Sequence, residues 1–120
     1  FGPNFHLVRH SHPLGDCTYY VAAGELTMGK RRLKAGSTIF VPNEMPYKFV
    51  AGPDGVEVLE FRSGGSIPGK PKMKIEETSL ASIQKIIDDY KANQHLWKIP
   101  PNFSDTGHVK PHEGSKQLTP

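Results

Sequence analysis

The feature that most limits the fold is a series of short β-favouring stretches between residues 4 and 62, each closed by glycine or proline. Residues 19–21 and 26–28 end at glycines, and the apolar run 38–41 lies between a glycine and a proline. Residues 47–50 and 56–61 follow, and the Gly-Pro-Asp-Gly sequence between them is typical of a tight turn. Many short strands with regular turn signals predict an all-β sandwich or barrel.

The pattern changes after residue 62. Residues 63–71 are rich in glycine, serine and proline and are expected to form a linker. A helix capped by Thr78 or Ser79 should follow. We therefore expect a single domain: a barrel core with its linker in 1–71, a helical segment packing on it in 72–98, and an extended or disordered tail in 99–120. The expected apolar helix face consists of Leu80, Ile83, Ile86, Ile87 and Tyr90.

Composition excludes several classes of protein. A chain of 120 residues has room for one modest core, and no apolar run approaches the roughly 18 residues of a membrane span. The net charge is +3, and the basic run at residues 30–34 has no aromatic platform beside it, so we expect no nucleic-acid partner. The single cysteine, Cys17, and the lack of a signal-peptide pattern predict a cytoplasmic location.

Two histidines stand out as candidates for chemistry. His10 and His12 are two residues apart in a predicted strand, and the period of two puts both imidazoles on one face. Paired imidazoles suit zinc, iron, copper, nickel or manganese when further ligands complete the shell. The alternative is a pair of exposed histidines near the end of a strand.

These segments resemble the two consecutive motifs of the cupin superfamily. The first motif is His-x-His, a short loop, a glutamate and a strand closing at glycine; the second is a glycine, five residues, a proline and, shortly afterwards, a histidine. His10 and His12 match the first pair, Gly24 closes the strand, and residues 36–42 match the second motif. The resemblance covers residues 8–62. We therefore expect a cupin-type jelly-roll β-barrel with one C-terminal helix and an extended arm.

The resemblance carries over the metal ligands only in part. Counting forward from His12, the glutamate position falls on Asp16; counting back from Gly24, it falls on Cys17. The final histidine position falls on Tyr47, whose phenol becomes a good ligand only if a metal lowers its ordinary pKa of about 10. The ligand set that the resemblance implies is His10, His12, Asp16 or Cys17, and Tyr47.

Three interpretations stay open. The first is an altered shell around one divalent transition metal such as zinc, iron, manganese or nickel. The second is a metal-free pocket in which the same side chains bind an organic ligand. The third is a vestigial site on a barrel that serves as a sensor or an assembly module, since cupins host many unrelated functions.

The expected function is the binding of a small carbonyl- or carboxylate-bearing molecule in the barrel. If the protein is a catalyst, we expect isomerase-, lyase- or cyclase-type acid–base chemistry, with Tyr47 and His12 as the catalytic residues. Only nine residues precede His10, so the strand that closes the barrel must come from the C-terminal arm, from a partner chain or from residues before Phe1. We expect a homodimer with strand exchange, because an unpaired edge invites a partner, and no membrane partner.

Overall fold

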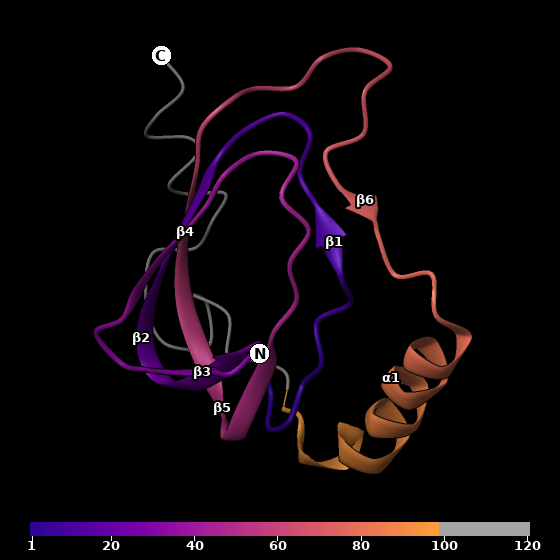
Figure 1. Ribbon diagram of the computed structural model, residues 1–120. Helices are drawn as coiled ribbons and strands as arrows, with labels where there is room; N and C mark the ends of the chain where they lie inside the picture. The colour runs from indigo at the N-terminus through magenta and orange to yellow at the C-terminus, as the bar shows by residue number, and fades with distance from the viewer. Residues whose placement is uncertain (99–120) are drawn as a thin grey trace, which may run out of the picture.

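The computed structural model describes residues 1–98 and arranges them around one long central strand, β2 (Cys17–Met28). On one side, β2 pairs along most of its length with β5 (Val50–Arg62). On its other side, its first half pairs with β4 (Thr38–Val41) and its second half with β3 (Arg31–Lys34), all antiparallel (Figure 1). The remaining elements are β1 (His10–Ser11), β6 (Lys74–Ile75), the helix α1 (Leu80–Asn93) and the short 3₁₀ helix η1 (Gln94–Leu96).

A second layer faces this sheet. Residues 4–12, which include β1, run antiparallel to residues 44–52, and the backbone amide of Leu7 donates to Phe49 O at 2.9 Å. The other side of β1 pairs with β6, which sets His10 opposite Ile75. The strand beside β1 therefore comes from the segment between the linker and the helix, a source that the sequence did not suggest. The extended or disordered tail predicted for residues 99–120 lies outside the described residues.

The core lies between the two layers. On β2, Cys17, Tyr19 and Val21 point inward and are almost fully buried, whereas Tyr20 is 40% exposed on the outer face. The period of two predicts that Val56 and Val58, with Glu60 as a candidate third, face one way and that Glu57, Leu59 and Phe61 face the other. This is confirmed: Leu59 and Phe61 are exposed on the outer face, while Val56 is buried and Val58 half-buried on the inner face. Because of this alternation, the charged side chains of Glu60 and Arg62 lie on the inward-facing side of β5.

The expected turn at residues 52–55 occurs inside β5 and does not end a strand. The pairing of β5 with β2 steps from Gly24↔Val56 to Leu26↔Ala51, so residues 52–55 leave the ladder opposite one residue of β2. Such an irregularity bends a strand without ending it. The partner strand β2 likewise continues through Gly24, where the sequence predicted its end, as far as Met28.

The fold is thus mostly β with one helix. The hydrogen bonds among residues 1–98 define a four-stranded and a two-stranded sheet and do not link them into a closed ring of strands. None of the helices in this part of the chain is long and apolar enough to cross a membrane.

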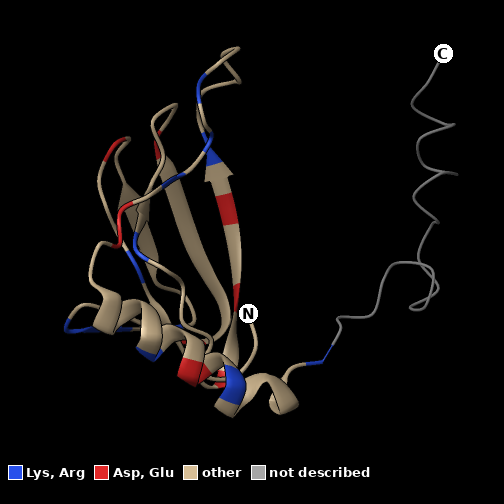
Figure 2. Cartoon of the chain, turned by 90° about the vertical axis from the view of Figure 1, so that its right-hand side faces the viewer, with Lys and Arg blue, Asp and Glu red and all other residues tan. Residues whose placement is uncertain are grey.

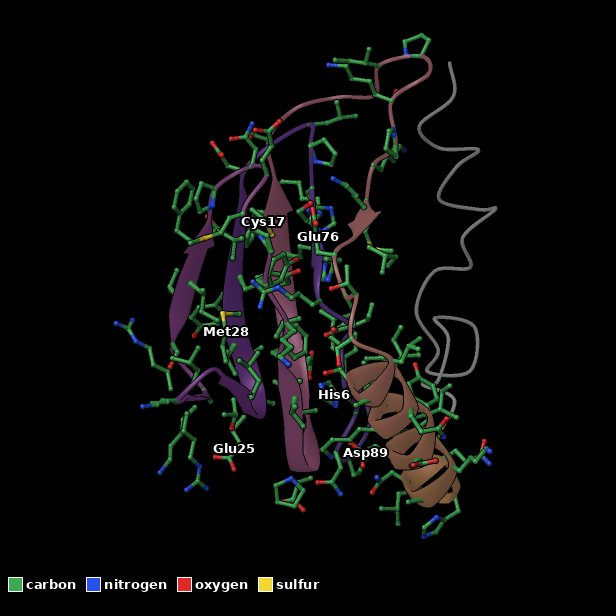
Figure 3. All side chains as sticks on the ribbon, turned by 45° about the vertical axis from the view of Figure 1, so that its right-hand side comes forward. His6, Cys17, Glu25, Met28, Glu76 and Asp89 are labelled. Carbon is green, nitrogen blue, oxygen red and sulfur yellow. The ribbon has the colours of Figure 1, made fainter. Side chains whose placement is uncertain are left out.

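The helix α1 lies beside the second layer, across the lower ends of the strands (Figure 2). Ser79 caps it by accepting a hydrogen bond from Ser82 N at 3.3 Å, as expected for one of the two candidate caps. The expected apolar face is partly wrong: Leu80 is 82% exposed, while Asp89, which lies outside that face, contacts His6 (Figure 3). The N-terminal segment sets the orientation of α1, because both polar and aromatic side chains of this segment contact the helix.

Two glycines bring the loop after β1 against the end of β5. Gly64 has a φ of 82°, and a Cβ on it would collide with the carbonyl oxygen of Leu14. A Cβ on Gly15 would collide with the carbonyl oxygen of Ser63 in the same way. The loops can approach this closely only because neither residue has a side chain.

Gly64→Ala should therefore lower the free energy of unfolding by at least about 2 kcal/mol, since an L-residue in the left-handed region costs roughly 1–2 kcal/mol before the collision is counted. Urea titration followed by circular dichroism measures this. The control is Gly65→Ala, because nothing lies within 4 Å of the added methyl group. Equal stabilities for the two variants would contradict the close approach of the loops.

Candidate functional site

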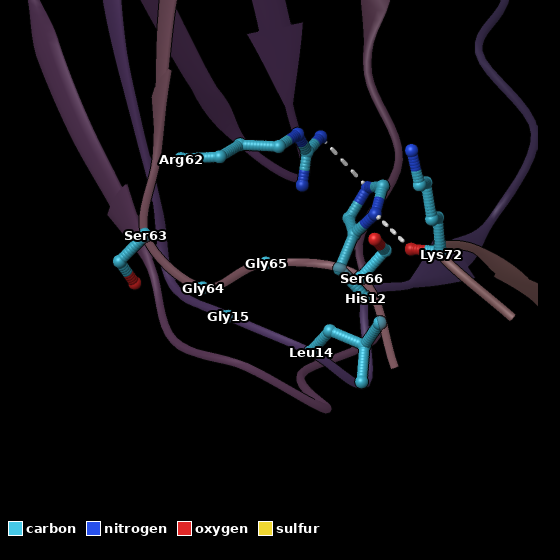
Figure 4. Close-up of a pocket in the computed structure, with 9 residues that line it drawn as sticks. All are labelled: His12, Leu14, Gly15, Arg62, Ser63, Gly64, Gly65, Ser66 and Lys72. Carbon is cyan, nitrogen blue, oxygen red and sulfur yellow. Dashed lines mark hydrogen bonds between the residues drawn. The ribbon is translucent and has the colours of Figure 1, made fainter. Parts of the chain in front are cut away.

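The meeting of these loops creates a pocket of about 300 Å³ at one end of the strands. We call it the mouth pocket (Figure 4). Its wall contains the basic side chains of Arg62 and Lys72, the imidazole of His12, two serines and three glycines, and no aspartate or glutamate lines it. The side chains that line the pocket are therefore either neutral or positively charged, which favours an anionic ligand.

Hydrogen bonds hold the His12 ring in one orientation. Its Nδ1 lies 2.9 Å from the carbonyl oxygen of Lys72, and because a carbonyl only accepts, Nδ1 carries the proton. The lone pair on Nε2 then accepts from the Arg62 guanidinium at 2.9 Å. The phenol of Tyr47 lies 3.2 Å from the same nitrogen. The ring nitrogen that would bind a metal thus already receives a hydrogen bond from a cation.

Arg62 reaches the mouth because it is the last residue of β5 on the inward-facing side. It forms an ion pair with Glu60, two residues earlier on that side, and about a third of its side chain is exposed. A guanidinium has five N–H donors, so Arg62 can contact both Glu60 and His12 and still present donors to the pocket.

Beneath the mouth lies a pair of buried tyrosines. The hydroxyls of Tyr19 and Tyr47 are 2.5 Å apart. Burial raises the pKa of both phenols, and the hydrogen bond with Tyr47 raises the pKa of Tyr19 further. Both hydroxyls are therefore protonated at neutral pH, which makes them hydrogen-bond donors in place of phenolate ligands.

His10 and Cys17 are buried deeper in the same interior. The His10 ring lies on the face that His12 shares, with 4.9 Å between the ring centroids, and its Nδ1 donates to Val8 O at 2.7 Å. Burial lowers the pKa of His10, so the ring is neutral at pH 7. Burial raises the pKa of Cys17, whose thiol donates to Glu60 at 3.7 Å.

Asp16 has a different role. Its Oδ1 accepts from the backbone amide of Asn43 at 2.9 Å, which fixes the turn after β4. The structure thus gathers His10, His12 and Tyr47, with Cys17 packed against Tyr47, and keeps the Asp16 carboxylate in the turn.

The ligand set expected from the sequence does not form a ready metal centre. Among residues 1–98, no three His, Cys, Asp or Glu side chains are grouped so that they could hold a metal ion. The residues present are a poor fit for a divalent cation as they are arranged, because the Arg62 guanidinium occupies the lone pair of His12.

Arg62 and Lys72 are not among the site residues predicted from the sequence. The period of two on β5 could have identified Arg62, because the alternation expected for residues 56–60 extends to it. No pattern in the sequence indicates Lys72, because its carbonyl contacts His12 from a position 60 residues further along the chain.

The comparisons with known proteins add little. No protein-family model matches the chain, and no curated protein matches it. A solved structure from Ralstonia eutropha, of a protein of unknown function with a cupin-like fold, is 18% identical with a TM-score of 0.49 over 86% of this chain and 71% of that one. A likeness at that level carries no argument about function. Residues 1–98 form a mostly β structure with one α-helix and a basic pocket.

The buried imidazole of His10 predicts sensitivity to acid. The unfolded chain takes up a proton on His10 near its ordinary pKa of 6.5, whereas the folded protein resists it. The contribution of neutral His10 to the free energy of unfolding is therefore fully present above pH 6.5, and it is lost as the pH falls below that value. In His10→Asn this loss should be smaller. Urea titrations at pH 7.5 and pH 5.5 measure the free energy of unfolding of both proteins. If His10→Asn loses as much stability between these pH values as the wild-type protein does, the lowered pKa of His10 is not the cause.

Proposed function

We propose that the protein is a small-molecule-binding protein of the cupin type that holds a small organic carboxylate in the mouth pocket. The observation that carries the proposal is the Arg62 guanidinium, held against His12 in a pocket without acidic lining. This corresponds to the second of the three interpretations that the sequence left open.

The cupin-type jelly roll is supported by agreement between the motif and the backbone. The glycines that close the first motif and open the second, Gly24 and Gly36, have φ of 71° and 92°, which a side chain disfavours. Two antiparallel layers enclose the histidine pair, as a jelly-roll barrel would.

The basic groups of the pocket match the chemistry of a carboxylate. A guanidinium can bind both carboxylate oxygens at once, and such charge-assisted bonds are about twice as strong as neutral ones. Lys72 adds a second positive charge at the opposite wall, and the hydroxyls of Ser63 and Ser66 are neutral donors. The ion pair with Glu60 reduces the positive charge of Arg62 without removing it.

Should the bound molecule also be converted, His12 and Tyr47 are the acid–base pair. When a bound carboxylate draws Arg62 away from His12, the Nε2 of His12 can accept a proton from the bound molecule while the phenol of Tyr47 donates one, and the 3.2 Å contact between the two groups then lets His12 return a proton to Tyr47. This would suit isomerisation or elimination next to a carboxylate.

Arg62→Gln should weaken carboxylate binding roughly 10- to 100-fold, because it removes a charge-assisted hydrogen bond of about 1.5–3 kcal/mol. Thermal-shift and calorimetric titrations with benzoate and succinate measure this, and benzamide and succinamide are the uncharged analogues. Lys91→Gln, on the exposed side of α1, is the control variant. The proposal fails if the amides bind as well as the acids, or if none of the four probes binds.

A divalent metal, the first interpretation, remains the alternative. It would require Arg62 to leave His12, so that His10 and His12 could both present Nε2 with Tyr47 and Cys17 completing the shell. The homodimer with strand exchange also stays a prediction.

Metal analysis separates the two functions. Under our proposal, protein purified without chelator contains well below one equivalent of zinc, iron, manganese or nickel, and EDTA leaves its melting temperature unchanged. Near-stoichiometric metal in the wild-type protein that is lost in His12→Ala would instead establish the metal centre.

A further inference from the structure

A second opening lies between the two layers, along the edge of the sheet that β3 and β4 form. It has a volume of about 510 Å³, within the range of roughly 300–1,000 Å³ usual for small-ligand pockets. We call it the side cleft. Its floor is apolar, with Met28, Ile39 and Leu33 contributed by the strands and Met45 by the turn after β4.

The side cleft is separate from the mouth pocket. The two share no lining residue, and Tyr47 lies between them: it is one of the residues that line the side cleft, and its hydroxyl lies 3.2 Å from His12 Nε2. Met28 and Ile39, partly buried, pack against the core cluster that includes Tyr47, so the floor of the cleft is continuous with the protein interior.

Three exposed cations line the side cleft: Arg9, Arg31 and Lys48. They come from three different parts of the chain, the residue before β1, the start of β3 and the segment after β4. Within residues 1–98, none of the three forms an ion pair. No aspartate or glutamate lines the cleft.

An apolar floor with unpaired positive charges is complementary to one kind of molecule. A hydrocarbon chain gains free energy by covering Met28, Ile39 and Leu33, at about 25 cal/mol for each Å² of apolar area removed from water. A terminal carboxylate can pair with the guanidinium of Arg31 or Arg9. A neutral lipid would leave the cations unused, and a small anion would leave the apolar floor uncovered.

We propose that the side cleft binds an amphipathic monoanion, a medium-chain fatty acid or a similar carboxylate with an unbranched apolar chain. The chain lies on the floor of the cleft, and the carboxylate lies at the rim beside Arg31. This site goes beyond the small carboxylate proposed for the mouth pocket and does not depend on it.

The neighbouring arginine offers a matched control. Arg32 is the next residue on β3, points to the opposite face of the sheet, and forms a bidentate ion pair with Glu25 at 2.7 and 2.8 Å. Arg31 and Arg32 are therefore the same residue type on the same strand, but only Arg31 lines the side cleft.

The experiment is isothermal titration of the full chain with sodium decanoate below its micelle concentration. The expected result is one site per chain, about tenfold weaker in Arg31→Gln and unchanged in Arg32→Gln and Arg62→Gln. Met45→Glu, which adds a negative charge to an exposed position on the cleft, should weaken binding as well. In Arg62→Gln, which removes the guanidinium of the mouth pocket, acetate, which lacks the chain, and 1-decanol, which lacks the charge, should bind at least tenfold more weakly than decanoate.

Four results would overturn the proposal. Equal affinity for 1-decanol would mean that the cations take no part. Loss of binding in Arg62→Gln but not in Arg31→Gln would assign decanoate to the mouth pocket. Several weak sites, insensitive to Arg31→Gln, would indicate adsorption. No binding to the full chain would mean that another occupant, such as a second copy or residues 99–120, covers the cleft. None of these results affects the benzoate test of the mouth pocket.

Discussion

The pairing of β2 with strands on both of its sides is the constraint on which the rest of the structure depends. Because β2 is bonded to β5 along one edge and to β4 and β3 along the other, its inward side chains have neighbours on every side. Cys17, Tyr19 and Val21 are consequently buried in a row. The same pairing carries β5 to its last residue beside the start of β2, where Arg62 meets the mouth pocket.

Burial then decides the protonation of the interior. Removing phenols, a thiol and an imidazole from water disfavours their charged forms, which raises the pKa of the tyrosines and the cysteine and lowers that of His10. All of these groups are neutral at pH 7. Among residues 1–98, the cations that adjoin this neutral interior lie at its openings, where guanidinium and ammonium groups remain in contact with water.

The two openings differ in what surrounds their cations. At the mouth, Arg62 and Lys72 stand among serines and glycines, and the space is small. At the side, Arg31 and Arg9 border a larger space floored by methionine and aliphatic side chains. Both surroundings favour anions, but the polar one suits a compact acid and the apolar one a chain with an acid at its end. Tyr47 connects the two openings, because it lines the side cleft and its hydroxyl lies 3.2 Å from His12 Nε2 at the mouth pocket.

The sequence by itself determined the local features. The period of two predicted that His10 and His12 share a face and that Leu59 and Phe61 lie on the face opposite Val56 and Val58, because side-chain direction in a strand depends only on the backbone. Glycine and proline located most of the strand ends, although residues 52–55 form an excursion within β5. Only the tertiary structure decided what surrounds the histidines. Arg62 and the Lys72 carbonyl reach His12 across 50 and 60 residues of chain, and a contact of that separation leaves no periodic trace in the sequence.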